Sequence, residues 1–164
     1  MADDYRQIAV ALGERLGITF APAGKEDLAV LRRHNFPERI VKFYEAFEPV
    51  EKWDPDFVPD ELEPEYAPEI SLHSIRGMLC MTTEMEPGAC LAPYGFWVCA
   101  STYFGDGFLF DGRYEPPGEP KIVKASHEIF CGETTQEQID KYIEPVAENF
   151  IEFLEKLAGG EIRP

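Results

Sequence analysis

The chain has 164 residues, of which 45% are hydrophobic, so it is long enough for one globular domain spanning 1–164 with a buried core. Its formal net charge is −16, from 31 acidic and 15 basic residues. This charge argues against direct binding to nucleic acid or to an anionic membrane surface, because both need a basic protein face. It favours a basic protein partner, or it serves only to keep the protein in solution.

Targeting and cofactor signals are lacking. The chain has no run of about 18 apolar residues and no signal-peptide pattern at its N-terminus, so we expect a cytoplasmic protein without a transmembrane helix. Four cysteines show neither a CxxC pair nor zinc-like spacing. We therefore expect no metal and no cofactor, and we expect reduced thiols that act as small hydrophobes at Cys80, Cys90, Cys99 and Cys131.

The first third of the chain is predicted to be helical. Apolar residues at helical spacing predict a helix over 4–16, ended by Gly17, and a second helix over about 25–34. A third helix begins at Pro37, a residue type favoured at the first helical position. The second helix is expected to direct two leucines inward and two arginines outward: Leu28, Leu31, Arg32 and Arg33. The third has an apolar stripe of Ile40, Val41, Phe43, Tyr44 and Phe47.

Residues 45–69 differ sharply from what precedes them. They hold ten acidic residues, five prolines and one lysine, and therefore contribute −9 to the net charge. The prolines exclude a continuous helix, whereas the recurring aromatics are not typical of a disordered linker. We expect an extended loop that is anchored by aromatics and that either contacts a basic partner or is merely solvated. The predicted contact residues are Trp53, Asp54, Asp56, Asp60, Glu61, Glu63, Glu65 and Tyr66.

Strand signals follow. A strand region is predicted from Ile70 to about Thr83, and a hairpin is predicted from strands at 96–104 and 107–111. Its turn is expected at Gly105-Asp106-Gly107, because a tight Asp-Gly turn requires positive φ at both central residues.

The last part of the chain is predicted to return to helix. A strand is expected at 121–125, followed by a short helix that a capping box at Thr134 or Thr135 would begin. The final helix is expected to start at Pro145 and end at Gly159-Gly160. The predicted fold class is therefore α+β: N-terminal helices, a central mainly antiparallel sheet with a hairpin at about 96–111, and C-terminal helices.

No motif in the chain specifies a chemistry. The three histidines share no ligand spacing, and the Gly-x-Ser-x-Gly pattern is absent. Ser101 and Cys99 fall in a predicted strand, where packing is the expected role. Asp106 and Asp111 could form a carboxylate pair if one lay in an apolar pocket with a raised pKa; otherwise they serve as a turn residue and a strand-end residue.

The aromatic residues around the hairpin alternate between the two faces of the predicted sheet. If helices cover only one face, the other exposes rings beside carboxylates, as protein-binding surfaces do; helices on both faces would bury them. A secondary candidate surface therefore comprises Tyr103, Asp106 and Asp111.

Three segments together resemble the SUKH superfamily of small α+β domains. Phe36-Pro37-Glu38 through Tyr44 is similar to that family's Leu-Pro start of the helix before the sheet. The hairpin at 97–111 resembles the family's central strand pair, and 147–154 resembles its terminal Ser-Phe-x-x-Phe-Leu helix. The resemblance implies a SUKH-like domain. Bacterial members are largely immunity proteins that bind and silence a toxin, often a nuclease, and fungal members are linked to regulation of cell-wall synthesis.

The function expected from these observations is protein binding without catalysis. An immunity-type protein, monomeric or weakly dimeric, would bind and neutralise a basic toxin domain, because nucleases need basic surfaces to hold phosphates. The alternatives are a regulatory or scaffold module, or a hydrolase that uses Asp106, Asp111 and a histidine.

Overall fold

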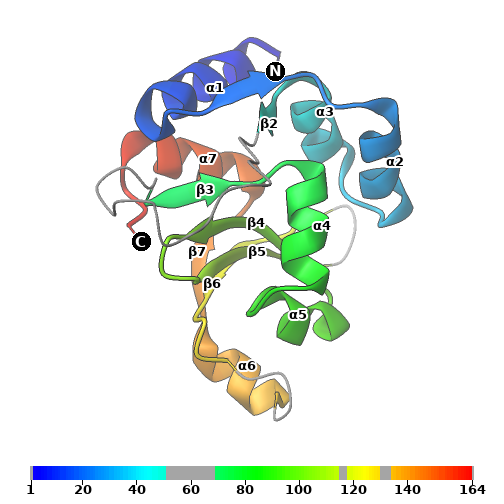
Figure 1. Ribbon diagram of the computed structural model, residues 1–164, viewed down its shortest axis with the longest axis vertical. Coiled ribbons are helices and arrows are strands. Elements are labelled where there is room, and N and C mark those ends of the chain that lie inside the picture. The colour runs from blue at the N-terminus through cyan, green and yellow to red at the C-terminus, as the bar shows by residue number, and fades with distance from the viewer. Residues whose placement is uncertain (1, 51–68, 115–117, 130–133, 164) are drawn as a thin grey trace, which may run out of the picture.

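The computed structural model describes residues 2–50, 69–114, 118–129 and 134–163. Helices from both ends of the chain flank a central antiparallel sheet (Figure 1), which confirms the predicted α+β class.

The N-terminal third contains the three predicted helices: α1 (Ala2–Leu16), α2 (Lys25–Arg33) and α3 (Glu38–Ala46). Gly17 follows α1 with φ 66°, and the predicted inward residues of α2 and α3 are buried except Phe47, which is half-buried. Two short strands, β1 (Thr19–Ala21) and β2 (Glu48–Val50), pair antiparallel beside these helices.

The main sheet is an antiparallel meander of five strands in chain order. The strands are β3 (Ile70–Leu72), β4 (Phe96–Thr102), β5 (Gly107–Asp111), β6 (Ile122–Ala125) and β7 (Ile143–Ala147). The remaining helical elements are α4 (Ile75–Thr83), α5 (Gly88–Leu91), a 3-10 turn (Ala92–Tyr94), α6 (Gln136–Tyr142) and α7 (Phe150–Gly159). A capping box formed by Thr135 and Gln138 begins α6, so the second of the two predicted caps is confirmed.

Both faces of the sheet are covered. Phe108, Phe110 and Ile122 pack in one core cluster with residues of α1, α3 and α7. Leu109 and Val123, which point the other way, pack with residues of α5 and α6. Figure 1 shows α1 and α7 lying together beyond one side of the sheet and α6 at the opposite end of the molecule. The exposed-face alternative is therefore wrong for the strands. Among the Phe, Tyr and Trp residues that the structure describes, those that are exposed are Tyr103 and Phe104 in the hairpin loop.

The prediction of strand from Ile70 to Thr83 is correct only for β3. Ser74 begins a helix instead: its side-chain oxygen accepts a hydrogen bond from the Gly77 backbone N–H at 3.0 Å. The buried residues Ile75, Met78 and Thr82 then follow helical spacing, so this apolar run, Cys80 included, lies in α4.

The prediction that the last helix starts at Pro145 is also wrong. Pro145 lies in β7, an edge strand, where a missing N–H is tolerated. Helix α7 begins after Asn149, whose side chain accepts a hydrogen bond from the Glu152 N–H at 3.0 Å. The predicted core residues Phe150, Phe153, Leu154 and Leu157 are all buried, and Gly160 ends the helix with φ 74°.

The hairpin forms where predicted, but its turn differs. Residues 103–106 form a longer loop in which the Thr102 N–H donates to the Asp106 carbonyl at 2.8 Å. Among the hairpin-loop residues only Gly105 has positive φ, at 95°. The Asp106 side chain is occupied by contacts across the sheet, so Asp106-Gly107 is not the two-residue turn that we predicted.

The cysteines behave in two ways. Cys80 and Cys99 are free thiols, as expected, whereas Cys90 is disulfide-bonded, so the prediction of a reduced thiol is wrong at that position. Cys131 lies outside the described residues. A membrane-spanning helix would need a longer apolar run than any described helix has.

Candidate functional site

The predicted acidic contact surface lies outside the described residues. All eight of its residues fall within 51–68. Of the secondary surface, Tyr103, Asp106 and Asp111 are all described, but they do not form one cluster. Tyr103 and Asp106 lie at the loop end of the hairpin, whereas Asp111 is the last residue of β5 at the other end.

The hairpin loop presents two exposed aromatic rings. Tyr103 is 49% exposed and Phe104 is 70% exposed, and their ring centroids are 5.6 Å apart in an edge-to-face arrangement. Large exposed rings are unusual on a surface otherwise rich in charge. Phe104 was not among the predicted site residues; its position at the loop apex is the signal that could have identified it.

Asp106 holds this loop against the neighbouring strand. Its Oδ1 lies 2.7 Å from Nδ1 of His127 and accepts a hydrogen bond from the His127 backbone N–H at 3.1 Å. Its Oδ2 lies 3.2 Å from the Lys124 ammonium. Burial alone would raise the pKa of Asp106, but the hydrogen bonds from His127 and Lys124 outweigh it and lower the pKa below the usual range.

We expect Asp106→Asn to destabilise the protein at neutral pH but not in acid. Because the pKa of Asp106 is lower in the folded protein than in the unfolded chain, ionised Asp106 stabilises the fold above its unfolded pKa, and this stabilisation is lost as the pH falls through the folded pKa. The free energy of unfolding should fall by up to about 1 kcal/mol at about pH 7, because the partners are partly exposed, and the difference should shrink toward zero as the pH falls through the folded pKa. Thermal melts at neutral and acidic pH measure this.

Glu161→Gln is the matched control, because Glu161 is exposed and far along the chain from this loop. A stability difference for Asp106→Asn that does not change with pH would show that its effect comes from packing rather than from the ionised carboxylate.

Asp111 is engaged by a neighbouring arginine. The Arg113 guanidinium donates to both carboxylate oxygens of Asp111, at 2.8 and 2.7 Å, and its Cζ lies 4.7 Å from the centre of the Phe96 ring. Burial alone would raise the pKa of Asp111, but the hydrogen bonds from Arg113 lower it overall.

The two aspartates are separated by the length of β5, roughly 16 Å for an extended strand. A glycosidase-type pair needs a separation of roughly 5–10 Å and one carboxyl with a raised pKa, so Asp106 and Asp111 do not form such a pair in this structure.

Cys99 and Ser101, for which packing in a strand was predicted, are buried. Cys99 is fully buried, and burial raises the pKa of its thiol, so this side chain packs as predicted. The Ser101 hydroxyl lies 2.9 Å from Nε2 of His73, within the distance a nucleophile and base require, but each residue is only 9% exposed. The contact satisfies two buried polar groups rather than presenting a nucleophile to solvent.

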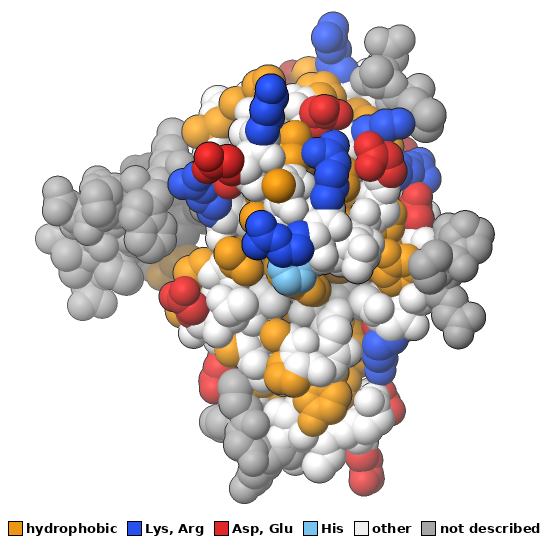
Figure 2. Space-filling model, turned by 90° about the vertical axis from the view of Figure 1, so that its right-hand side faces the viewer, with side chains coloured by type: hydrophobic (Ala, Val, Ile, Leu, Met, Phe, Trp, Pro, Cys, Tyr) orange, Lys and Arg blue, Asp and Glu red, His pale blue; other side chains and the backbone are white. Residues whose placement is uncertain are grey.

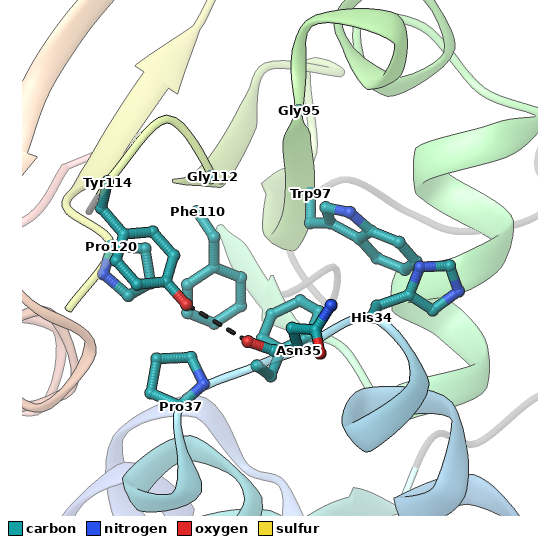
Figure 3. Close-up of a pocket in the computed structure, with 10 residues that line it drawn as sticks. His34, Asn35, Pro37, Gly95, Trp97, Phe110, Gly112, Tyr114 and Pro120 are labelled. Atoms are coloured by element: carbon teal, nitrogen blue, oxygen red, sulfur yellow. Dashed lines mark hydrogen bonds between the residues drawn. The ribbon is translucent and has the colours of Figure 1, made fainter. Parts of the chain in front are cut away.

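A pocket of about 360 Å³ lies at the other end of the hairpin from the exposed loop (Figure 3). Its aromatic side chains come from the link between α2 and α3, from strands β4 and β5, and from the segment after β5. They are His34, Phe36, Trp97, Phe110 and Tyr114. The Phe36 ring packs edge-to-face on Trp97 and on Phe110, with centroid distances of 5.4 and 5.3 Å. The His34 ring lies 4.4 Å from the Trp97 ring.

Unusual backbone geometry shapes this pocket. Asn35 has φ 56°, a left-handed conformation that asparagine tolerates better than most residues, and its carbonyl accepts a hydrogen bond from the Tyr114 hydroxyl at 3.2 Å. Gly112 donates its N–H to the Gly95 carbonyl at 3.1 Å, and a Cβ at Gly112 would collide with that carbonyl oxygen. The close approach of these glycines holds the two strand ends together at the pocket.

Sequence reasoning missed this pocket. Its residues come from segments up to 86 positions apart, so no local spacing joins them. The recognisable signals were the Asn35-Phe36-Pro37 link between α2 and α3 and the glycines at positions 95 and 112 that flank the hairpin.

Within the described ranges, no group of three or more His, Cys, Asp or Glu side chains could hold a metal ion. Comparisons with protein-family models, with curated proteins and with solved structures found no match to this chain.

Proposed function

We propose that this chain is a non-catalytic protein-binding domain of the immunity type, which binds and neutralises a basic toxin domain of the nuclease class. The observation that carries the proposal is the exposed pair Tyr103 and Phe104 on a braced loop, in a chain with a net charge of −16. The resemblance to the SUKH superfamily supports the immunity role, and that family's regulatory members make a scaffold module the alternative.

The hairpin loop has the properties of a binding hot spot. Aromatic rings dominate such sites because they bury a large area while losing little side-chain entropy. Here the contacts of Asp106 with His127 and Lys124 fix the loop before any partner arrives. A preorganised loop loses less entropy on binding than a loop that must first become ordered.

Acidity supplies the second part of the proposal. Residues 45–69 contribute −9 to the net charge, and a nuclease must carry a basic surface that binds phosphates. Opposite charges accelerate the encounter, so an acidic inhibitor would reach such a surface quickly and could cover the substrate groove.

The proposal is tested by sequencing the genes beside this chain's gene and, if one encodes a toxin-like nuclease domain, by purifying that domain. Stoichiometric addition of this protein should abolish the nuclease activity, and calorimetry should give a one-to-one complex. Phe104→Ala should weaken binding roughly 30-fold if the ring is a hot spot. Val10→Ala, which shortens another exposed apolar side chain, should leave binding unchanged. A neighbouring toxin that is neither bound nor inhibited would contradict the immunity role.

Charge removal in the acidic segment should slow association. Changing Asp60, Glu61, Glu63 and Glu65 to their amides should lower the association rate about tenfold at low salt and flatten its salt dependence. The melting temperature of each variant serves as a folding control.

The matched control removes the same number of charges elsewhere, by amide substitution at the exposed residues Glu14, Glu144, Glu155 and Glu161. If both variants slow association equally, only the net charge matters. If neither does, residues 51–68 are not the contact surface and the hairpin loop becomes the principal candidate.

A further inference from the structure

The exposed hairpin loop lies between two acidic residues from the neighbouring parts of the sheet. The Tyr103 N–H donates to the carbonyl of Glu69 at 3.2 Å, so Glu69, directly before β3, lies beside the loop. On the other side, Asp106 of the loop contacts His127, and Glu128 follows that histidine after β6. Glu69 and Glu128 are both exposed. The aromatic loop is therefore flanked by one exposed acidic residue on each side.

The flanking carboxylates are not neutralised by the protein itself. Neither Glu69 nor Glu128 forms an ion pair with another residue in the described ranges. The Lys124 ammonium, which also lies near the loop, is 3.2 Å from Asp106 and is offset by that carboxylate. The surface around the loop therefore keeps an excess of negative charge, which favours a cationic group on the partner.

The ring pair narrows the choice of cation. Tyr103 and Phe104 meet edge to face and are both exposed, so ring surface is accessible to a partner. A guanidinium group can stack on such a ring while its planar fork donates to carboxylates, which a compact ammonium group does less well. A purely apolar occupant would take the flanking carboxylates out of water without pairing them, which is unfavourable.

Another face of the molecule shows the contrast. On the side of α2 and α4, Lys, Arg, Asp and Glu side chains are interspersed (Figure 2). Arg76 of α4 is paired there with Asp27 of α2, at 2.9 Å. A face of mixed and paired charge selects no sign of partner, whereas the hairpin loop combines exposed rings with unpaired carboxylates of one sign.

We propose that the hairpin loop binds an arginine side chain of the partner protein, with the guanidinium stacked on the Phe104 ring and paired with the carboxylates of Glu69 and Glu128. The inference rests on the function proposed above, because it names the group on the basic partner that this loop receives. Arginines on a nuclease surface hold phosphates. Their capture by the loop would therefore remove groups that the nuclease needs for its substrate.

The test titrates the full chain with a synthetic peptide of alternating arginine and glycine, in about 0.15 M salt, and follows the ring signals of Tyr103 and Phe104 by nuclear magnetic resonance. Matched peptides replace arginine with lysine or with citrulline, which has nearly the same shape but no charge. The arginine peptide should shift both rings saturably. The lysine peptide should bind about threefold more weakly and the citrulline peptide about tenfold more weakly.

Two sets of variants assign the binding to this loop. Phe104→Leu keeps an apolar side chain but removes the ring, so it should weaken arginine-peptide binding about threefold and abolish the preference for arginine over lysine. Glu69→Gln with Glu128→Gln should weaken binding about fivefold. The matched control, Glu26→Gln with Glu38→Gln, removes the same charge from exposed positions in α2 and α3 and should leave binding nearly unchanged.

Three results would overturn the proposal. One is a titration in which the Tyr103 and Phe104 ring signals do not shift. Another is equal binding of the arginine and citrulline peptides. The third is full arginine-peptide binding by Phe104→Leu, which changes an exposed side chain and should fold normally. The peptides contain no toxin, so a failure here would leave the immunity role standing, and a failure to find a toxin would leave the arginine site standing.

Discussion

Phe153→Ala should lower the free energy of unfolding by about 3–5 kcal/mol. Phe153 in α7 has no exposed surface, and its ring centroid lies 5.4 Å from that of Phe108 in β5 and 6.4 Å from that of Phe150. Its removal would leave a cavity between the last helix and the centre of the sheet, and the strand cannot move to fill it because it is hydrogen-bonded on both sides. Urea denaturation of both proteins measures the difference.

Phe104→Ala is the matched control, because it deletes the same ring at a position that is 70% exposed. It should change the free energy of unfolding by less than about 0.5 kcal/mol. If Phe153→Ala does not fold, the milder Phe153→Leu gives a measurable value. A cost below about 1 kcal/mol for Phe153→Ala would show that α7 packs on the sheet by a different face.

Sequence reasoning predicted best where one periodicity fits a long segment. The stripe of α3 and the apolar face of α7 repeat at helical spacing over two or more turns, and the structure buries both. The hairpin was predictable because its two strands are apolar on both faces, as strands covered on both sides must be.

The errors fall where a local signal was ambiguous. The apolar run from Ile75 to Thr83 fits the composition of a strand as well as the spacing of a helix. It is helical, and the Ser74 side chain caps its first turn. Pro145 is compatible both with the start of a helix and with an edge strand. It lies in a strand because its segment pairs with β6, and the local sequence alone does not reveal that pairing. The disulfide state of Cys90 likewise depends on tertiary distance rather than on cysteine spacing.

The candidate sites could likewise be predicted only where a local sequence signal marks them. Charge composition identified an acidic segment, and Tyr103 and Asp106 were found because they lie in one recognisable hairpin. The pocket required the α2–α3 link, the ends of β4 and β5 and Pro120 to meet, which depends on tertiary packing as well as on the sheet register. Residues that are individually ordinary, such as Trp97, acquire a candidate role only from that assembly.

Gly88→Ala is expected to destabilise the protein by about 3 kcal/mol. Gly88 is buried at the start of α5, where a methyl group would lie 2.7 Å from Cγ2 of Val98 and 2.9 Å from the carbonyl carbon of Met81, and closer still to the Met81 carbonyl oxygen. Two of these atoms belong to the backbone of α4 and cannot rotate away, so α5 would have to move off both α4 and β4. Denaturant melts and near-ultraviolet circular dichroism would detect the loss of stability and of packing.

Gly159→Ala makes the same chemical change near the end of α7, where a methyl group would meet only the flexible Glu161 side chain, at 3.5 Å. Because alanine loses less backbone entropy than glycine on entering a helix, this variant should be neutral or more stable by up to about 1 kcal/mol. Comparing the two variants therefore separates the effect of close packing on stability from the effect of helix propensity. If Gly88→Ala were tolerated as well as Gly159→Ala, α5 would not be packed tightly against α4 and β4, and the core on that side of the sheet, around Leu91 and Leu109, would be looser than the structure shows.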